Sequence, residues 1–195
     1  MAECAPITGA VNLDPSCEAL KKKGGISKRI YIGSLADVSA YTLDATTKEL
    51  KTLVMKPGTK LISATGRKYK NNTSLGNTQT DNGPLFQHNV VFAAYYDSQT
   101  EKETLELLAG ADDLFVIVEL NHGKMEAYGL VAGNGRLAEG LTMTSAGGSG
   151  TAAGDASNLV LTFAGEEDKL PVFASFGATM ADDIAYLDAL LAVAA

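Results

Sequence analysis

Residues 114–131 read LFVIVELNHGKMEAYGLV, and this stretch decides the fold. Residues 114–120 are almost entirely apolar and rich in β-branched side chains, which is typical of a buried strand. Residues 121–124 (NHGK) have turn chemistry, and residues 125–131 return with alternating apolar side chains. The stretch therefore predicts an antiparallel β-hairpin.

More strands are predicted on both sides of this hairpin. Upstream, strand patterns cover residues 26–32, 38–43, 50–55, 61–69 and 85–96. Downstream, they cover residues 137–144, 158–163 and 170–173, and the last is expected at a sheet edge because it contains Pro171. Residues 70–84 are polar and are expected to form a long loop with at most weak strands. The glycine-rich residues 147–155 are expected to form a second loop.

Two helices are predicted among and after the strands. Ser98 and Glu101 have the spacing of a capping box, in which each side chain satisfies a free amide of the first turn. Leu105 and Leu108 then share one face, and Gly110 is a stop signal. Residues 180–195 predict a C-terminal amphipathic helix, whose apolar face holds Ile184, Leu187, Leu190, Leu191 and Ala194.

These elements together predict a mainly-β α+β fold, an antiparallel β-sandwich or barrel with one embedded helix and a C-terminal helix. We expect an N-terminal arm in residues 1–25, the β-domain in residues 26–173 and a helical extension in residues 174–195. The extension is expected to pack on its own sheets rather than on a neighbour.

The chain of 195 residues is acidic, with 16 Lys and Arg against 23 Asp and Glu and a net charge of −7. Basic groups drive nucleic-acid binding, so this balance disfavours a protein that grips DNA. It leaves open a channel through which DNA passes without adhering. The lysines at 21–23 are interpreted as a solvated turn rather than a nucleic-acid patch.

The N-terminus lacks the basic and apolar regions of a signal peptide, and no apolar run is long enough to span a membrane. Synthesis in the cytoplasm and no membrane association are therefore expected. Cys4 and Cys17 are the only cysteines. We expect free thiols, with a disulfide between them as the alternative.

No motif indicates catalysis, a cofactor or a metal, and the chain is not expected to be an enzyme. His88 lies in a predicted strand and is interpreted as a core or interface residue, and His122 at the hairpin tip is not expected to be catalytic. Three carboxylate pairs are interpreted as solvated turns or helix starts: Asp112 and Asp113, Glu166 and Glu167, and Asp182 and Asp183. Gly133 and Gly135 form a lone G-x-G that is expected to be structural, and the glycosylation sequons at Asn71 and Asn72 have no role without secretion.

Several short motifs recur in one order along the chain. They are Cys17-Glu18, Gly24-Gly25-Ile26, Arg29-Ile30-Tyr31-Ile32, Asp37-Val38, the helix and strand of residues 101–118, Asn121-His122-Gly123-Lys124, Tyr128-Gly129, the stretch 147–158 and Leu170-Pro171. In this order they resemble a family of virion structural proteins, the tail or tail tube proteins of tailed phages of Bacteroidetes-type hosts. The resemblance covers residues 17–173, and the C-terminal helix departs from it.

The resemblance implies a tail-tube-like β-sandwich or barrel, six copies of which form a ring with sheets joined edge to edge around a lumen. Stacked rings would form a conduit for DNA in the virion tail, assembled in the host cytoplasm. The implied partners are copies of the chain, other tail proteins, and DNA as non-specific cargo. The alternatives are another virion structural protein (capsid decoration, tail completion or baseplate component) or a soluble carbohydrate-binding β-sandwich.

Overall fold

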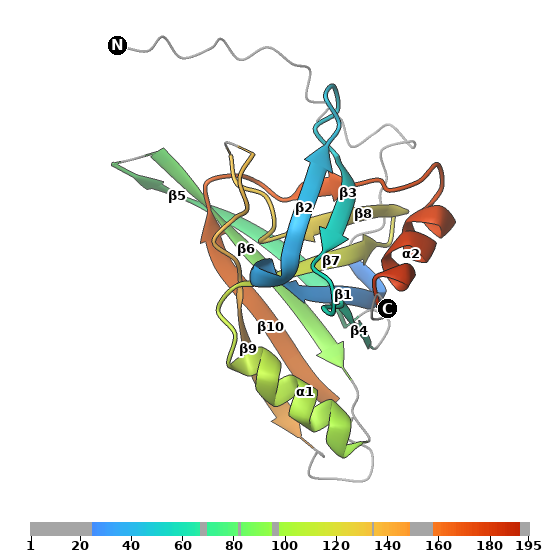
Figure 1. Cartoon of the computed structure of the whole chain (residues 1–195). Coiled ribbons are helices and arrows are strands. Elements are labelled where there is room, and N and C mark those ends of the chain that lie inside the picture. Colours follow the sequence, from blue (N-terminus) through green and yellow to red (C-terminus); the bar gives the residue numbers. More distant parts are fainter. Residues whose placement is uncertain are drawn as a thin grey trace.

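The computed structural model describes residues 25–66, 70–81, 83–94, 98–133, 135–148 and 158–191, which form two β-sheets and two α-helices (Figure 1). The predicted mainly-β α+β fold with one embedded and one C-terminal helix is confirmed. Cys4, Cys17 and the rest of the predicted arm before Gly25 lie outside the described residues.

The larger sheet has seven strands and is built around the predicted hairpin. Its order is β2 (Val38–Leu43), β3 (Leu50–Met55), β11 (Val172–Ala174), β8 (Lys124–Tyr128), β7 (Leu114–Leu120), β1 (Ile26–Ser34) and β4 (Ile62–Thr65). All neighbours are antiparallel except β11 and β3, which meet in parallel through Ala174 and Leu50. The hairpin of β7 and β8 pairs from Val116 with Tyr128 to Leu120 with Lys124.

The prediction of an edge strand at residues 170–173 is wrong. β11 lies inside the sheet, between β3 and β8. Pro171 stands just before the strand, so the missing N–H of proline does not interrupt the ladder. Val172 and Ala174 are buried in the core, which holds this three-residue strand in an interior position.

The smaller sheet has four strands, in the order β5 (Asn72–Thr80), β6 (Gly83–Ala94), β10 (Asn158–Glu167) and β9 (Thr142–Gly148). The long loop predicted at residues 70–84 is wrong, because β5 pairs with β6 along its whole length. Most of its side chains are exposed, so the segment lacks the apolar alternation that indicates a strand. The loop predicted at residues 147–155 is wrong for its first two residues, because β9 continues to Gly148.

The two sheets share one hydrophobic core, and a second core lies on the other face of the seven-stranded sheet. Val116 and Val118 of β7 face the four-stranded sheet, where they join Val90 and Phe92 of β6 among others. Phe115 and Ile117 of β7 lie in the second core with residues of the C-terminal helix. Residues 114–118 are continuously apolar because both faces of β7 are buried there.

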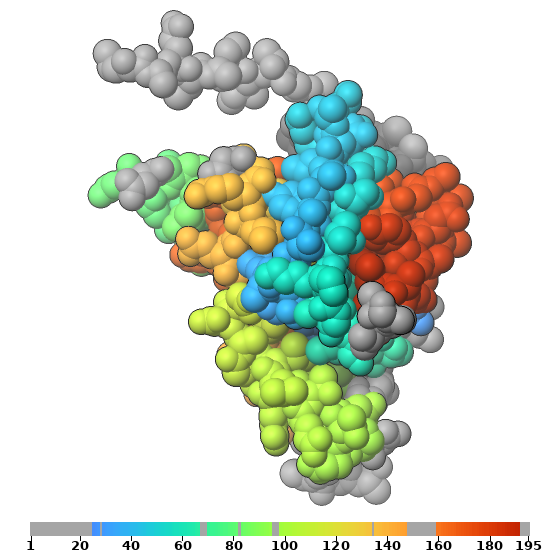
Figure 2. Space-filling view, in the orientation of Figure 1, coloured from blue at the N-terminus to red at the C-terminus, as the bar shows by residue number. Residues whose placement is uncertain are grey.

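The C-terminal helix α2 (Met180–Ala189) covers the second core, and Figure 2 shows it (red) beside β2 and β3 (blue to teal). Leu187 is fully buried, and Ile184, Leu190 and Leu191 pack around it as the sequence predicts. The Tyr186 hydroxyl donates to the Leu53 carbonyl at 3.0 Å. The helix therefore packs on its own sheet.

The embedded helix α1 (Gln99–Ala109) follows β6 and lies beside β9 and β10 (Figure 1). The predicted capping box is present: Ser98 Oγ accepts from the Glu101 amide, and the Glu101 carboxylate accepts from the Ser98 amide. Leu108 is its only buried residue, and Leu105 is half-buried. Only a narrow face of this helix is therefore packed against the rest of the domain.

Candidate assembly surface

The four-stranded sheet has two open edges, formed by β5 and β9. Neither strand contains a charged residue or a proline, and both pair with their inner neighbours in unbroken register. Natural edge strands usually carry lysine, proline or a bulge, or are very short, because an unprotected edge pairs with another chain. In the described part of the chain, both strands lack all of those protections. β5 is the more open edge, because α1 lies beside β9, and Leu141, just before β9, already exchanges backbone hydrogen bonds with Leu114 of β7.

The seven-stranded sheet has protected edges by comparison. β2 pairs with β3 through two register irregularities, between Val38 and Ala40 and between Thr42 and Leu43. The opposite edge, β4, is only four residues long. Bulges and short length both discourage pairing between copies. The four-stranded sheet is therefore the one whose edge strands can more readily form hydrogen bonds with a strand of another chain.

The outer face of the four-stranded sheet, which points away from the shared core, is nearly uncharged and mixes hydroxyl and amide side chains with aliphatic ones, Leu85 among them. The register and the alternation of side chains place these residues on it: Asn72, Ser74, Gly76 and Thr78 of β5, Gln87, Asn89, Val91 and Ala93 of β6, Val160, Thr162, Ala164 and Glu166 of β10, and Thr142, Thr144 and Ala146 of β9. Most are exposed or half-exposed. Glu166 is the one charged group among these described positions, and none is aromatic.

Side chains on this outer face are joined across the strands. Asn89 Nδ2 donates to Ser74 Oγ at 3.2 Å, which links β6 to β5. Gln87 Nε2 donates to Glu166 Oε1 at 3.3 Å, which links β6 to β10. Cross-strand hydrogen bonds of this kind hold a polar face in an ordered arrangement.

His88 lies on the opposite, core-facing side of β6 and is almost fully buried. The Gly129 amide donates to Nδ1 at 3.2 Å, so the ring proton lies on Nε2, which donates to the Lys169 carbonyl at 2.8 Å. Burial lowers the pKa of this imidazole. The interpretation of His88 as a satisfied core residue is confirmed.

His122 lies at the hairpin tip and lines an open, mainly apolar cleft of about 350 Å³. Glu126 and Tyr128 line this cleft, and the Tyr128 hydroxyl donates to Glu126 Oε2 at 2.6 Å. Burial raises the pKa of both groups, and the short hydrogen bond opposes the change in Glu126. His122 Nδ1 is buried without a hydrogen-bond partner among the described residues. These groups form no nucleophile–base–orienter arrangement.

One member of each carboxylate pair is not a solvated group, which corrects the sequence interpretation. Asp113 accepts from the Ser34 hydroxyl at 2.6 Å, Glu167 from the Glu139 and Gly140 amides, and Asp183 from the Phe176 and Gly177 amides. Glu167 is only 2% exposed, and burial raises its pKa. The amides that bind Glu167 lie in a segment distant in the sequence, whereas those that bind Asp183 lie just before α2.

The remaining motifs take structural positions. Asn71 is buried, donating to the Ser27 carbonyl and accepting from the Ala93 amide. Gly133 donates to Asp168 at 2.7 Å, and Gly135 adopts a positive φ of 74°, as a turn residue does. Across the described ranges, no three His, Cys, Asp or Glu side chains gather closely enough to hold a metal ion. Neither described helix has the length and apolar character needed to cross a membrane.

No family model matches the chain, and no curated protein or solved structure matches it. The open edges and the outer face of the four-stranded sheet are therefore the features on which a function must rest. Sequence reasoning missed them because it read β5 as a loop. The available signal was the frequency of threonine, a β-branched residue, in residues 72–80.

Proposed function

We propose that this chain is a structural subunit of a phage tail tube and assembles into rings of six copies. The free edge of β5 in one copy would pair with the free edge of β9 in the next. Because the two edges are different surfaces, the contact is heterologous, and it closes into a ring when the rotation between copies closes. Closure pairs every open edge of the four-stranded sheets.

The observation that carries this proposal is that one sheet has both two edge strands without charge or proline and an outer face with a single charged position, Glu166. A ring closed through these edges presents the outer face to its lumen. A lumen of hydroxyl, amide and small aliphatic groups, with Glu166 as the one charge among these strand positions, gives the DNA phosphates no row of cations to bind. Such a surface suits a conduit. The absence of aromatic side chains there disfavours the carbohydrate-binding alternative.

The test is electron microscopy of the purified protein across a concentration series, with sedimentation in parallel. Rings or tubes with an open lumen are expected. A chain that remains monomeric at the highest concentrations would contradict self-assembly through these edges.

An edge variant makes this test specific. The double variant Asn77→Lys in β5 and Ser145→Lys in β9 introduces a charge on each of the two edge strands. We expect this variant to stay monomeric. The matched control is Ser39→Lys in β2, an exposed position on the edge of the other sheet, which should assemble as the parent does. Equal loss of assembly in both variants would place the interface elsewhere.

A further inference from the structure

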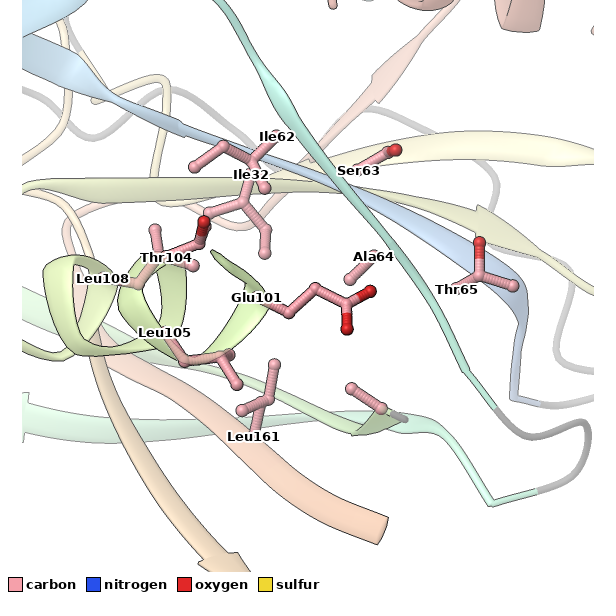
Figure 3. Close-up of a pocket in the computed structure, with 11 residues that line it drawn as sticks. Ile32, Ile62, Ser63, Ala64, Thr65, Glu101, Thr104, Leu105, Leu108 and Leu161 are labelled. Carbon is pink, nitrogen blue, oxygen red and sulfur yellow. The ribbon is translucent and has the colours of Figure 1, made fainter. Parts of the chain in front are cut away.

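The space between the two sheets is closed by α1 at one side of the four-stranded sheet. A cavity of about 330 Å³ lies between the helix and β4, and Figure 3 shows Leu105 and Leu108 of α1 around it with Ile62 of β4 and Leu161 of β10. β9 lies beside the helix as well. α1 therefore stands between the sheets where β4 and β9 are the edge strands.

At the opposite edge, where β5 is the last strand, the space between the sheets forms the open cleft of about 350 Å³ that His122 lines. β5 contributes Thr73 and Leu75 to this cleft, and the seven-stranded sheet contributes Tyr128 and Phe173 among others. Leu75 is 49% exposed and Phe173 is 38% exposed. Covering large apolar side chains stabilises an assembly, so the cleft is suited to receive a side chain from another molecule.

The last turn of α1 carries a side chain that fits this cleft. Leu107 is 77% exposed, more than any other large apolar side chain in the described part of the chain. One exposed leucine is ordinary on a protein surface. This one lies on the element at the β9 edge, in a helix that buries only Leu108 in its own domain. Its place relative to the two edges therefore decides what it contacts in an assembly.

We propose that the last turn of α1 in one copy packs into the cleft of the next copy, with Leu107 against Leu75 and Phe173. The inference rests on the proposed function, in which β9 of one copy pairs with β5 of the next. Leu75 of β5 and Met143 of β9 lie on the same, core-facing side of the four-stranded sheet, and α1 lies on that side too. Continuing the sheet from β5 into β9 of the neighbour therefore brings the neighbouring helix to the cleft.

The charges of the two surfaces are complementary. Glu106 is exposed in the last turn of α1, which has no basic residue, and the carbonyl end of a helix is itself partly negative. Lys124 stands beside the cleft, with Nζ 4.7 Å from the centroid of the Phe173 ring. Half of its side chain is exposed, although Glu49 lies 3.8 Å away in the same copy. Docking gives the end of α1 the cation that its own sequence lacks, which favours this orientation of the two copies.

The docking also makes the contact between copies selective. Main-chain hydrogen bonds along β5 accept any strand, whereas the cleft adds side-chain packing that only a strand with a helix beside it supplies. Each copy gives one helix and receives one, so the same contact repeats around the ring.

Disulfide trapping tests the docking directly. In a chain with Cys4→Ser and Cys17→Ser, Leu75→Cys is combined with Leu107→Cys, and the assembled protein is oxidised mildly and separated by non-reducing electrophoresis. We expect a ladder of covalent multimers of up to six chains, because each disulfide joins neighbouring copies. The control keeps Leu107→Cys but replaces Leu75→Cys by Val54→Cys, a position of similar exposure on β3.

Two outcomes overturn the docking, and they are distinguishable. Rings in micrographs without cross-links above those of the control would mean that α1 does not enter the cleft, while the ring itself stands. A parent protein that sediments as a monomer at the highest concentrations would refute the ring, and the docking with it.

The concentration dependence of assembly gives a second measurement. Leu107→Ser should raise the protein concentration at which half of the chains sediment as rings by about tenfold, because the packing against Leu75 and Phe173 is lost. Val54→Ser, the matched change on β3, should leave this concentration unchanged. Both side chains are exposed in the single chain, so the urea midpoints of both variants should match that of the parent. An unshifted concentration for Leu107→Ser would overturn the docking.

Discussion

The neighbouring carboxylates Glu166 and Glu167 show how one position along a strand decides the environment of a side chain. Glu166 lies on the exposed outer face and accepts from Gln87, whereas Glu167 is buried against the loop before β9. We expect Glu167→Ala to lower the free energy of unfolding by about 2 kcal/mol, because the Glu139 and Gly140 amides lose their acceptor. Glu166→Ala should change it by less than about 0.5 kcal/mol. Urea denaturation of both variants checks this, and similar losses would contradict it.

His88 makes a pH-dependent contribution to stability. Burial lowers the pKa of its imidazole in the folded state, so the unfolded chain takes up the proton more readily. Stability is therefore complete above the unfolded pKa of about 6.5 and is lost as the pH falls below it. Urea midpoints at pH near 7.5 and near 5.5 should show this loss in the parent and in His122→Gln, and a smaller one in His88→Gln. An equal loss in His88→Gln would show that another group is responsible.

At the scale of elements, α1 depends on its cap more than on its packing. Only Leu108 is buried along its length, while the Ser98–Glu101 box satisfies amides of the first turn. Ser98→Ala should destabilise the helix by about 1 kcal/mol, so that its amides exchange with solvent about fivefold faster. Thr100→Ala, an exposed position in the same turn, should have little effect. Unchanged exchange in Ser98→Ala would mean that packing alone holds the helix.

For the whole molecule, the proposed ring places one carboxylate of each copy, Glu166, in the lumen. Assemblies of the parent chain should not retain labelled DNA, whereas assemblies of Glu166→Lys should retain it in low salt and release it as salt increases. Glu103→Lys makes the same charge change on an exposed position of α1 and should behave as the parent does. Equal retention by both variants would contradict the lumenal position of Glu166, and a failure to assemble would instead count against the ring.

The sequence by itself determined the elements whose signals are local. The β7–β8 hairpin, the strands at residues 38–43 and 50–55 and the cap of α1 appear where the sequence predicts them, because apolar periodicity and capping spacing record burial and hydrogen bonding within a few residues. Tertiary structure alone decided that β5 is a strand, that β11 is interior and that Glu167 is buried. The position of β11 and the burial of Glu167 depend on backbone groups contributed by segments distant in the sequence, and side-chain periodicity carries no record of such partners. β5 pairs with the neighbouring β6, but its side chains are mostly exposed and lack the apolar alternation that indicates a strand.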